Sequence, residues 1–313
     1  MDSPRSSAEE AAPGAAAAPP PYFEARAELA YRFLAGAGLE IGALNWPLQV
    51  PSWAVVKNVD RMTPEQLREA YPEMAELELA EVDLIDDGER LESIADDSQD
   101  FIIANHFLEH TGDPIGTIAN HLAKLKSGGV LFYAVPDKRY TFDFRRESTP
   151  LEHIVRDHEQ GPAASRRGHF DEWGRLVVGT EADREDPAWP ERAEEVAREL
   201  EAEDFSIHTH SWTDATFLEL LLHCRCSFDE AFEIEVAARR ELEIVVILRK
   251  AGADPAPAAP AQTTPELAAE AEELRAQVAR LGRELAQTGR ELRQIQQSSS
   301  WRVTEPLRAA KAR

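Results

Sequence analysis

Short apolar runs recur along residues 39–250 of this 313-residue chain, and their spacing constrains the fold more than any other feature. Several are almost continuously apolar, as strands are when helices cover both faces of a parallel sheet. Helical patterns lie between them, at residues 63–74, 113–126 and 211–224. This alternation predicts an α/β fold with a doubly wound, mostly parallel sheet. The predicted strands are LEIGA, AVVKNVD, LAEVDLI, DFIIAN, GVLFYAV and ELEIVVILRK.

A seventh strand is predicted within FDEAFEIEV, residues 228–236, which lies only a few residues before the final strand. So short a link joins antiparallel neighbours, because parallel strands need a long crossover. We therefore expect a closing hairpin and an antiparallel strand at the edge of a seven-stranded sheet.

Polar residues stand at the carboxyl ends of four successive predicted strands, where ligands bind in open α/β sheets. Asp60 ends the second strand, 18 residues after Gly42. A carboxylate at about this distance from a glycine turn can hold ribose hydroxyls. The other polar groups are Glu40 and Asn45 near the first strand, Asp83, Asp86 and Asp87 near the third, and Asn105 and His106 at the fourth.

The link after the first strand argues against a dinucleotide. It contains Pro47 and Pro51 and no helical period, so it offers no helix N-terminus to a pyrophosphate. Asp86 and Asp87 would also repel a phosphate, whereas they would favour a sulfonium or an ammonium group. S-adenosylmethionine combines an adenosine end with these positive charges and fits the pattern.

Four blocks of the sequence together resemble class I S-adenosylmethionine-dependent methyltransferases. They are LEIGA, VD, DD and SQDFIIANHFLEHTGDPIGTIANHLAKLKSGGVLFYAVPD. The resemblance covers roughly residues 38–250, with its most specific part at 101–136 and its weakest between 141 and 205. It implies a Rossmann-like methyltransferase fold, a transferase activity and S-adenosylmethionine as the cofactor.

The resemblance also implies roles for single residues. Gly42 would let the backbone approach the methionine part of the cofactor, and Asp60 would hold the ribose. Either Asp86 or Asp87 would lie near the adenine amino group, a choice that stays open. The implied cofactor-binding residues are Glu40, Gly42, Ala43, Asn45, Asp60, Asp86, Asp87, Asn105 and His106.

Residues 141–205 have no strand period and would form an insertion on the substrate side, roofing the pocket. Asp137, His153 and His169 are the predicted catalytic bases, and His158 is a further candidate. The basic residues Lys138, Arg139, Arg145 and Arg146 could bind an anionic substrate or form a solvated face.

Two short motifs have a structural interpretation. Glu109 and His110 are expected to open or cap a helix. His208 and His210 lie on one side of an extended segment, but the sequence indicates no third ligand, so no metal site is predicted.

The composition indicates which partners the protein can bind and in which compartment it functions. A net charge of −24 argues against nucleic acid. Cys224 and Cys226 exclude a disulfide scaffold and suit a reducing compartment. No apolar run approaches the about 20 residues of a transmembrane helix, and AAPGAAAAPPP lacks the apolar core of a signal peptide. We therefore expect a cytoplasmic protein without a transmembrane segment.

Composition also suggests the domain boundaries. Residues 1–21 form a disordered Pro/Ala-rich tail, 22–250 the methyltransferase domain and 251–265 a linker. A heptad seam from Leu267 to Ile295 predicts a coiled coil over 266–297, which would pair with itself or with a partner protein. Residues 298–313 form a basic tail, which resembles tails that follow coiled coils in bacterial cell-envelope glycosyltransferases.

Two functions follow from these features. The first is methyl transfer from S-adenosylmethionine to a small-molecule or glycan acceptor, such as a sugar oxygen in cell-envelope polysaccharide assembly. The alternative is a non-catalytic, methyltransferase-like binding or scaffold module that self-associates or joins a glycosyltransferase complex.

Overall fold

A computed structural model describes residues 22–71, 74–228 and 232–252 of the chain. The chain separates into two units, Met1–Ala259 and Pro260–Arg313, and every described residue belongs to the first. The predicted tail 1–21, the linker beyond residue 252, the coiled coil 266–297 and the basic tail 298–313 lie outside the described residues.

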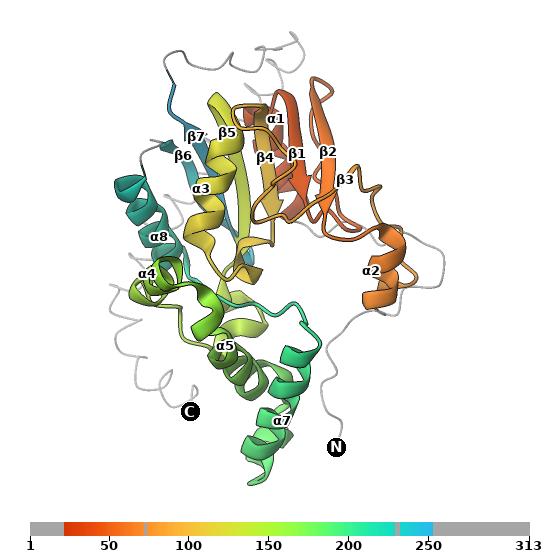
Figure 1. Ribbon diagram of the computed structural model, residues 1–313, viewed down its shortest axis with the longest axis vertical. Helices are drawn as coiled ribbons and strands as arrows, with labels where there is room; N and C mark the ends of the chain where they lie inside the picture. The colour runs from red at the N-terminus through yellow and green to blue at the C-terminus, as the bar shows by residue number, and fades with distance from the viewer. Residues whose placement is uncertain (1–21, 72–73, 229–231, 253–313) are drawn as a thin grey trace, which may run out of the picture. The chain divides into compact units, whose positions relative to one another are not determined.

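The described strands form one seven-stranded sheet in the order β3-β2-β1-β4-β5-β7-β6 (Figure 1). Neighbouring strands from β3 to β5 are parallel, whereas β7 runs antiparallel to both β5 and β6. The predicted α/β sheet and its closing hairpin are confirmed, with β6 as the outermost strand beside the antiparallel β7. The strands are β1 (Gly36–Ile41), β2 (Ala54–Asp60), β3 (Leu84–Ile85), β4 (Gln99–Asn105), β5 (Leu125–Pro136), β6 (Phe232–Arg240) and β7 (Glu243–Lys250).

Helices cover both faces of the sheet because its central strands are apolar on both sides. On one face Ile102 and Leu131 pack with residues of α3 (Pro114–Lys124) and α8 (Asp214–Ser227). On the other face Phe101 and Phe132 pack with residues of α1 (Tyr22–Phe33). α1 therefore covers a face that the helix-free link between β1 and β2 leaves open.

The predicted strand at 79–85 is shorter than expected, since β3 contains only Leu84 and Ile85. Just before it, the Asp83 carboxylate accepts a hydrogen bond from the Asn58 backbone N–H (2.8 Å), and the Asn58 side chain donates to the Glu81 carbonyl (2.9 Å). Side chains thus replace part of the backbone ladder along β2.

A helical segment, residues 138–204, joins β5 to the last part of the chain and lies beyond the carboxyl ends of the parallel strands (Figure 1). It contains α4 (Leu151–Gln160), α5 (Arg166–Trp173), α6 (Glu181–Glu185) and α7 (Trp189–Ala202). Elsewhere α2 (Pro64–Ala70) follows β2 and a single 3-10 turn, η2 (Leu108–His110), follows β4. Among the described helices, none combines the length and the apolar character that crossing a bilayer demands.

The link between β1 and β2 is held in place by a buried carboxylate. Both oxygens of Glu40 accept from the Leu48 backbone N–H, each at 3.0 Å. Burial raises the pKa of Glu40 to about 7, although the Leu48 hydrogen bond and the Arg26 charge oppose this rise. Glu40 therefore shapes the loop that begins at Gly42.

Replacing Glu40 by Gln should change how stability depends on pH. Between its usual pKa of 4.5 and its folded-state pKa of about 7, the folded chain keeps a proton that the unfolded chain has released. The contribution of Glu40 to the free energy of unfolding therefore falls as pH rises through this window, by up to about 3 kcal/mol.

We expect urea unfolding from about pH 5 to about pH 8 to show that the free energy of unfolding of the wild type falls relative to that of Glu40→Gln as the pH rises. The exposed Glu76→Gln serves as the control and should follow the wild type. Identical slopes for Glu40→Gln and the wild type would contradict the burial argument.

Candidate active site

The first strand ends in a glycine whose backbone other residues would adopt only under strain. Gly42 has φ +64°, and a Cβ built on it would meet no atom within 4 Å. Its N–H donates to the Val59 carbonyl (3.0 Å), which fixes the turn against β2. The loop therefore leaves open space over its backbone, with Ala43 buried and Asn45 half-buried beside it.

Asp60 lies at the end of β2, next to this turn, because Ile41 of β1 pairs with Val59 of β2. Its Oδ1 accepts from the Met62 backbone N–H at 3.2 Å. Burial raises the pKa of Asp60, against the opposing effect of the Met62 and Arg61 N–H groups. A half-buried carboxylate thus stands at the position predicted for ribose.

The two candidates for the adenine end differ in their surroundings. Asp86 accepts hydrogen bonds from the Ser93 N–H (2.8 Å) and hydroxyl (2.5 Å). Burial alone would raise the pKa of Asp86, but these hydrogen bonds outweigh burial, and the pKa is lowered overall. Asp87 is exposed and accepts from the Glu89 N–H at 2.9 Å. Both carboxylates therefore also shape the turn after β3, and the choice between them stays a prediction.

Asn105, at the end of β4, carries a buried amide that lacks partners. Neither its Oδ1 nor its Nδ2 has a hydrogen bond within the described part of the chain. The pairing of Ile41 with Ala104 places Asn105 beside Gly42. Unsatisfied buried amides are rare, and each is a site where a ligand can supply the missing partner.

His106 follows with φ +51°, is half-buried, and belongs to a row of charged groups whose other members are buried. Its Nε2 lies 3.1 Å from Glu243 Oε2, and its Nδ1 lies 3.4 Å from Glu109 Oε1. Burial lowers the pKa of His106, but the two carboxylates outweigh this effect and raise it to about 9. Arg26 of α1 completes the row, donating from Nε to Glu243 Oε1 at 2.8 Å.

These residues fit S-adenosylmethionine. The open space over Gly42 admits a ligand backbone, Asp60 offers a carboxylate to vicinal hydroxyls, and the Asn105 amide offers a donor and an acceptor. No helix N-terminus faces them from the link between β1 and β2, as the sequence predicted for a cofactor without a phosphate.

The predicted bases occupy different environments. Asp137 is buried, and its carboxylate accepts from Nε (2.9 Å) and Nη2 (2.6 Å) of Arg139. His153 and His169 come together, with their Nε2 atoms 3.2 Å apart, and Asp157 Oδ2 lies 3.0 Å from His153 Nε2. The structure therefore pairs the two histidines and keeps Asp137 apart in an ion pair.

The basic residues near Asp137 are mostly engaged. Arg139 also contacts Asp214 (2.7 Å), and Arg145 pairs with Glu181. Arg146 is buried and donates to Asp143, Glu172 and the carbonyls of His208 and Thr209. These three arginines hold the helical segment together, so the anionic-substrate interpretation of them is not supported by their geometry.

A cavity of about 500 Å³ reaches from Arg61, after β2, to His110, after β4. Its polar lining includes Glu89, Arg166 and Thr209, and His169 borders it as well. Burial, helped by the charges of Asp87 and Asp113, raises the pKa of Glu89 to about 7. Sequence reasoning missed Glu89, because a lone acid in a polar turn carries no local signal of burial.

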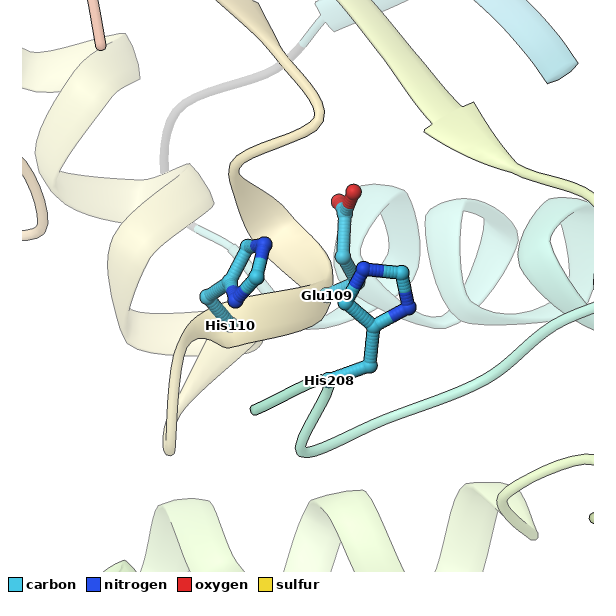
Figure 2. A group of neighbouring side chains, drawn as sticks. All are labelled: Glu109, His110 and His208. Atoms are coloured by element: carbon cyan, nitrogen blue, oxygen red, sulfur yellow. The ribbon is translucent and has the colours of Figure 1, made fainter. Parts of the chain in front are cut away.

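Glu109, His110 and His208 gather beside this cavity and are called the Glu109 cluster (Figure 2). The helix-capping interpretation of Glu109 and His110 is corrected: they form the 3-10 turn η2, and the Glu109 side chain is fully buried. Burial lowers the pKa of His110 to about 4. The sequence alone could not bring His208 to this pair.

A family model described as a methyltransferase domain matches residues 29–223, more than half of the chain. The chain belongs to this family and is a class I S-adenosylmethionine-dependent methyltransferase domain. S-adenosylmethionine is accordingly its cofactor. No curated protein matches the chain.

Solved structures that the chain matches include a SAM-dependent methyltransferase from Aquifex aeolicus, at 10% sequence identity and a TM-score of 0.37; the match covers 71% of this chain and 86% of that one. A SAM-dependent methyltransferase from Methanosarcina mazei matches at 18% sequence identity and a TM-score of 0.36. This match covers 71% of the present chain and 95% of the other. The YcgJ protein from Bacillus subtilis matches at 10% sequence identity and a TM-score of 0.38, and the match covers 74% of the present chain and 98% of the other. Because these identities and TM-scores are low, the assignment of the chain to the methyltransferase family rests on the family model.

Asp60→Ala should weaken S-adenosylmethionine binding by about 1.5–3 kcal/mol, the range for hydrogen bonds to a charged group. Isothermal calorimetry measures the change. Asp100→Ala is the control, because Asp100 lies at the amino end of β4 and accepts from Ala37 there (2.9 Å). Unchanged affinity in a folded Asp60→Ala protein would rule out the ribose assignment.

Asn105→Ala should separate a ligand-binding amide from a structural one. We expect about a tenfold loss of cofactor affinity without any fall in melting temperature, because the mutation removes polar atoms that bond to nothing in the described protein. Asn120→Ala, whose amide donates to the Glu89 carbonyl (3.2 Å), should leave the affinity unchanged. A destabilised Asn105→Ala with normal affinity would show that the amide is structural.

Proposed function

We propose that this chain transfers the methyl group of S-adenosylmethionine to an oxygen of a small-molecule or glycan acceptor. The observation that carries the proposal is the polar cavity of about 500 Å³ between the strand ends and the helical segment. Its volume suits a small organic ligand. Its lining of Arg61, Glu89, Arg166 and Thr209 offers donors and acceptors to a hydroxyl-rich molecule.

The protein's part in such a reaction is to orient an acceptor hydroxyl and to accept its proton. When bound, S-adenosylmethionine supplies a methyl group on a good leaving group. Glu89 lines the cavity with a pKa of about 7, so near neutral pH it can take a proton from a hydroxyl.

The three catalytic bases predicted from the sequence have different roles in this proposal. His169 borders the same cavity and would contact the acceptor, with His153 supporting its ring at 3.2 Å. Asp137 stays a predicted base, although a reaction would first have to release it from Arg139.

The cellular setting is proposed from the sequence alone. The resemblance of residues 298–313 to tails of cell-envelope glycosyltransferases supports a place in polysaccharide assembly in the cytoplasm. The heptad seam at 266–297 supports self-association or a helical partner protein.

Incubation with methyl-labelled S-adenosylmethionine and glycans extracted from cells should label a hydroxyl-bearing acceptor. The rate should rise as pH passes through about 7, because Glu89 accepts a proton only when ionised. Glu89→Gln should lower turnover on the order of 10²-fold and abolish that rise, whereas Glu185→Gln, at an exposed site, should not.

Two outcomes would contradict the proposal. Full activity in Glu89→Gln would remove Glu89 as the base. Saturable cofactor binding without labelling of any glycan or small molecule would instead favour a non-catalytic binding module.

A further inference from the structure

The Glu109 cluster brings together three side chains of the kinds that bind transition metals. One nitrogen or oxygen of each lies within 4.8 Å of its counterpart in the other two. Figure 2 shows both imidazoles directed toward the space beside the Glu109 carboxylate. η2 supplies Glu109 and His110, and the extended segment between α7 and α8 supplies His208.

Hydrogen bonds on the far side of each ring determine which nitrogen faces the cluster. His208 Nδ1 lies 2.6 Å from Asp143 Oδ2, and His110 Nδ1 lies 2.9 Å from the Ile207 carbonyl oxygen. A carbonyl oxygen only accepts, and the Asp143 carboxylate itself accepts from Arg146 Nη1 at 2.9 Å, so each Nδ1 carries the hydrogen. The Ser206 hydroxyl oxygen, 3.0 Å from His110 Nδ1, can accept from the same N–H. In neutral rings the Nε2 atoms therefore hold lone pairs.

The carboxylate opposite them is only partly satisfied by the protein. Glu109 has no exposed surface, and neither of its oxygens has a hydrogen bond from the described residues. The neighbouring His106 Nδ1, at 3.4 Å from Oε1, approaches only one of the two oxygens. A single proton could bridge one pair of these acceptors, whereas a metal ion satisfies all three at once.

Backbone contacts hold the two segments of the cluster together. The His210 N–H donates to the Glu109 carbonyl at 3.1 Å, and the Thr209 hydroxyl donates to the His110 carbonyl at 3.2 Å. In metal sites, the ring nitrogen of a histidine that does not bind the metal usually donates to a carboxylate or a carbonyl, which fixes the tautomer and the ring orientation. Asp143 and the Ile207 carbonyl occupy this position for His208 and His110.

We propose that the Glu109 cluster binds a divalent transition-metal ion, with zinc as the best match, through the Glu109 carboxylate and the Nε2 atoms of His110 and His208. Two imidazoles and one carboxylate are ligands that Zn²⁺ prefers, and three protein ligands leave a coordination position open. His110 borders the cavity of about 500 Å³, so that position can bind an acceptor oxygen. This last role rests on the proposed function; metal binding itself does not.

A second cluster, His153, Asp157 and His169, is a weaker candidate. Arg156 Nη2 donates to His153 Nδ1 at 2.9 Å, which places the hydrogen of a neutral ring on Nε2. That Nε2–H then donates to Asp157 Oδ2 at 3.0 Å. Hydrogen bonds within the protein thus account for this contact, and His153 provides a control for the first cluster.

Cobalt absorption tests the proposal on tag-free, full-length protein that has been stripped with a chelator. Excess Mg²⁺ occupies the exposed carboxylates of this acidic chain during a Co²⁺ titration. We expect one tightly bound Co²⁺ per chain with visible ligand-field bands, which Zn²⁺ displaces. Glu109→Gln and His208→Gln should each weaken binding at least about tenfold, and His153→Gln should bind as the wild type does.

Folding of each variant is checked by calorimetric titration with S-adenosylmethionine. If the two cluster variants fail to fold, the wild type alone decides: Zn²⁺ should raise its melting temperature in excess Mg²⁺. Absence of both the bands and this rise would overturn the proposal, as would loss of binding in His153→Gln alone. No acceptor is needed, so a failure of the methyl-transfer proposal would leave the metal result intact.

Discussion

The buried carboxylate of Glu109 is the constraint on which the carboxyl edge of this sheet depends. A charge without exposed surface costs several kcal/mol unless opposite charges and donors surround it. The row formed by Arg26, Glu243, His106 and Glu109 alternates in sign and joins α1, β7 and the segment that follows β4 at one place. The elements that frame the candidate cofactor site are therefore tied together by charge as well as by the apolar core.

Burial also distributes protons within this small region. It raises the pKa of Glu40 and Glu89 to about 7 and lowers that of His110 to about 4, whereas two carboxylates raise the pKa of His106 to about 9. Near neutral pH the site thus combines a charged histidine, a neutral histidine and carboxyls that can exchange a proton. Such separation of protonation states is typical of catalytic sites.

Much of the sheet could be predicted from sequence, because strands buried on both faces are apolar throughout. AVVKNVD coincides with β2, and the strand-end rule places Gly42, Asp60 and Asn105 side by side. The shortness of β3 could not be predicted, since the side chains of Asn58 and Asp83 take over its pairing. The Glu109 cluster could not be predicted either. His208 joins Glu109 and His110 through contacts between segments far apart in the chain, and a single sequence does not indicate such contacts.

A crystal structure with S-adenosylhomocysteine tests the account most directly, because that ligand shares the adenosine and amino acid parts of the cofactor. The account predicts the ribose hydroxyls at the Asp60 carboxylate, the ligand backbone over Gly42 and a hydrogen bond to the Asn105 amide. Electron density for the ligand at any other edge of the sheet, or an Asn105 amide still without a partner in the complex, would contradict it.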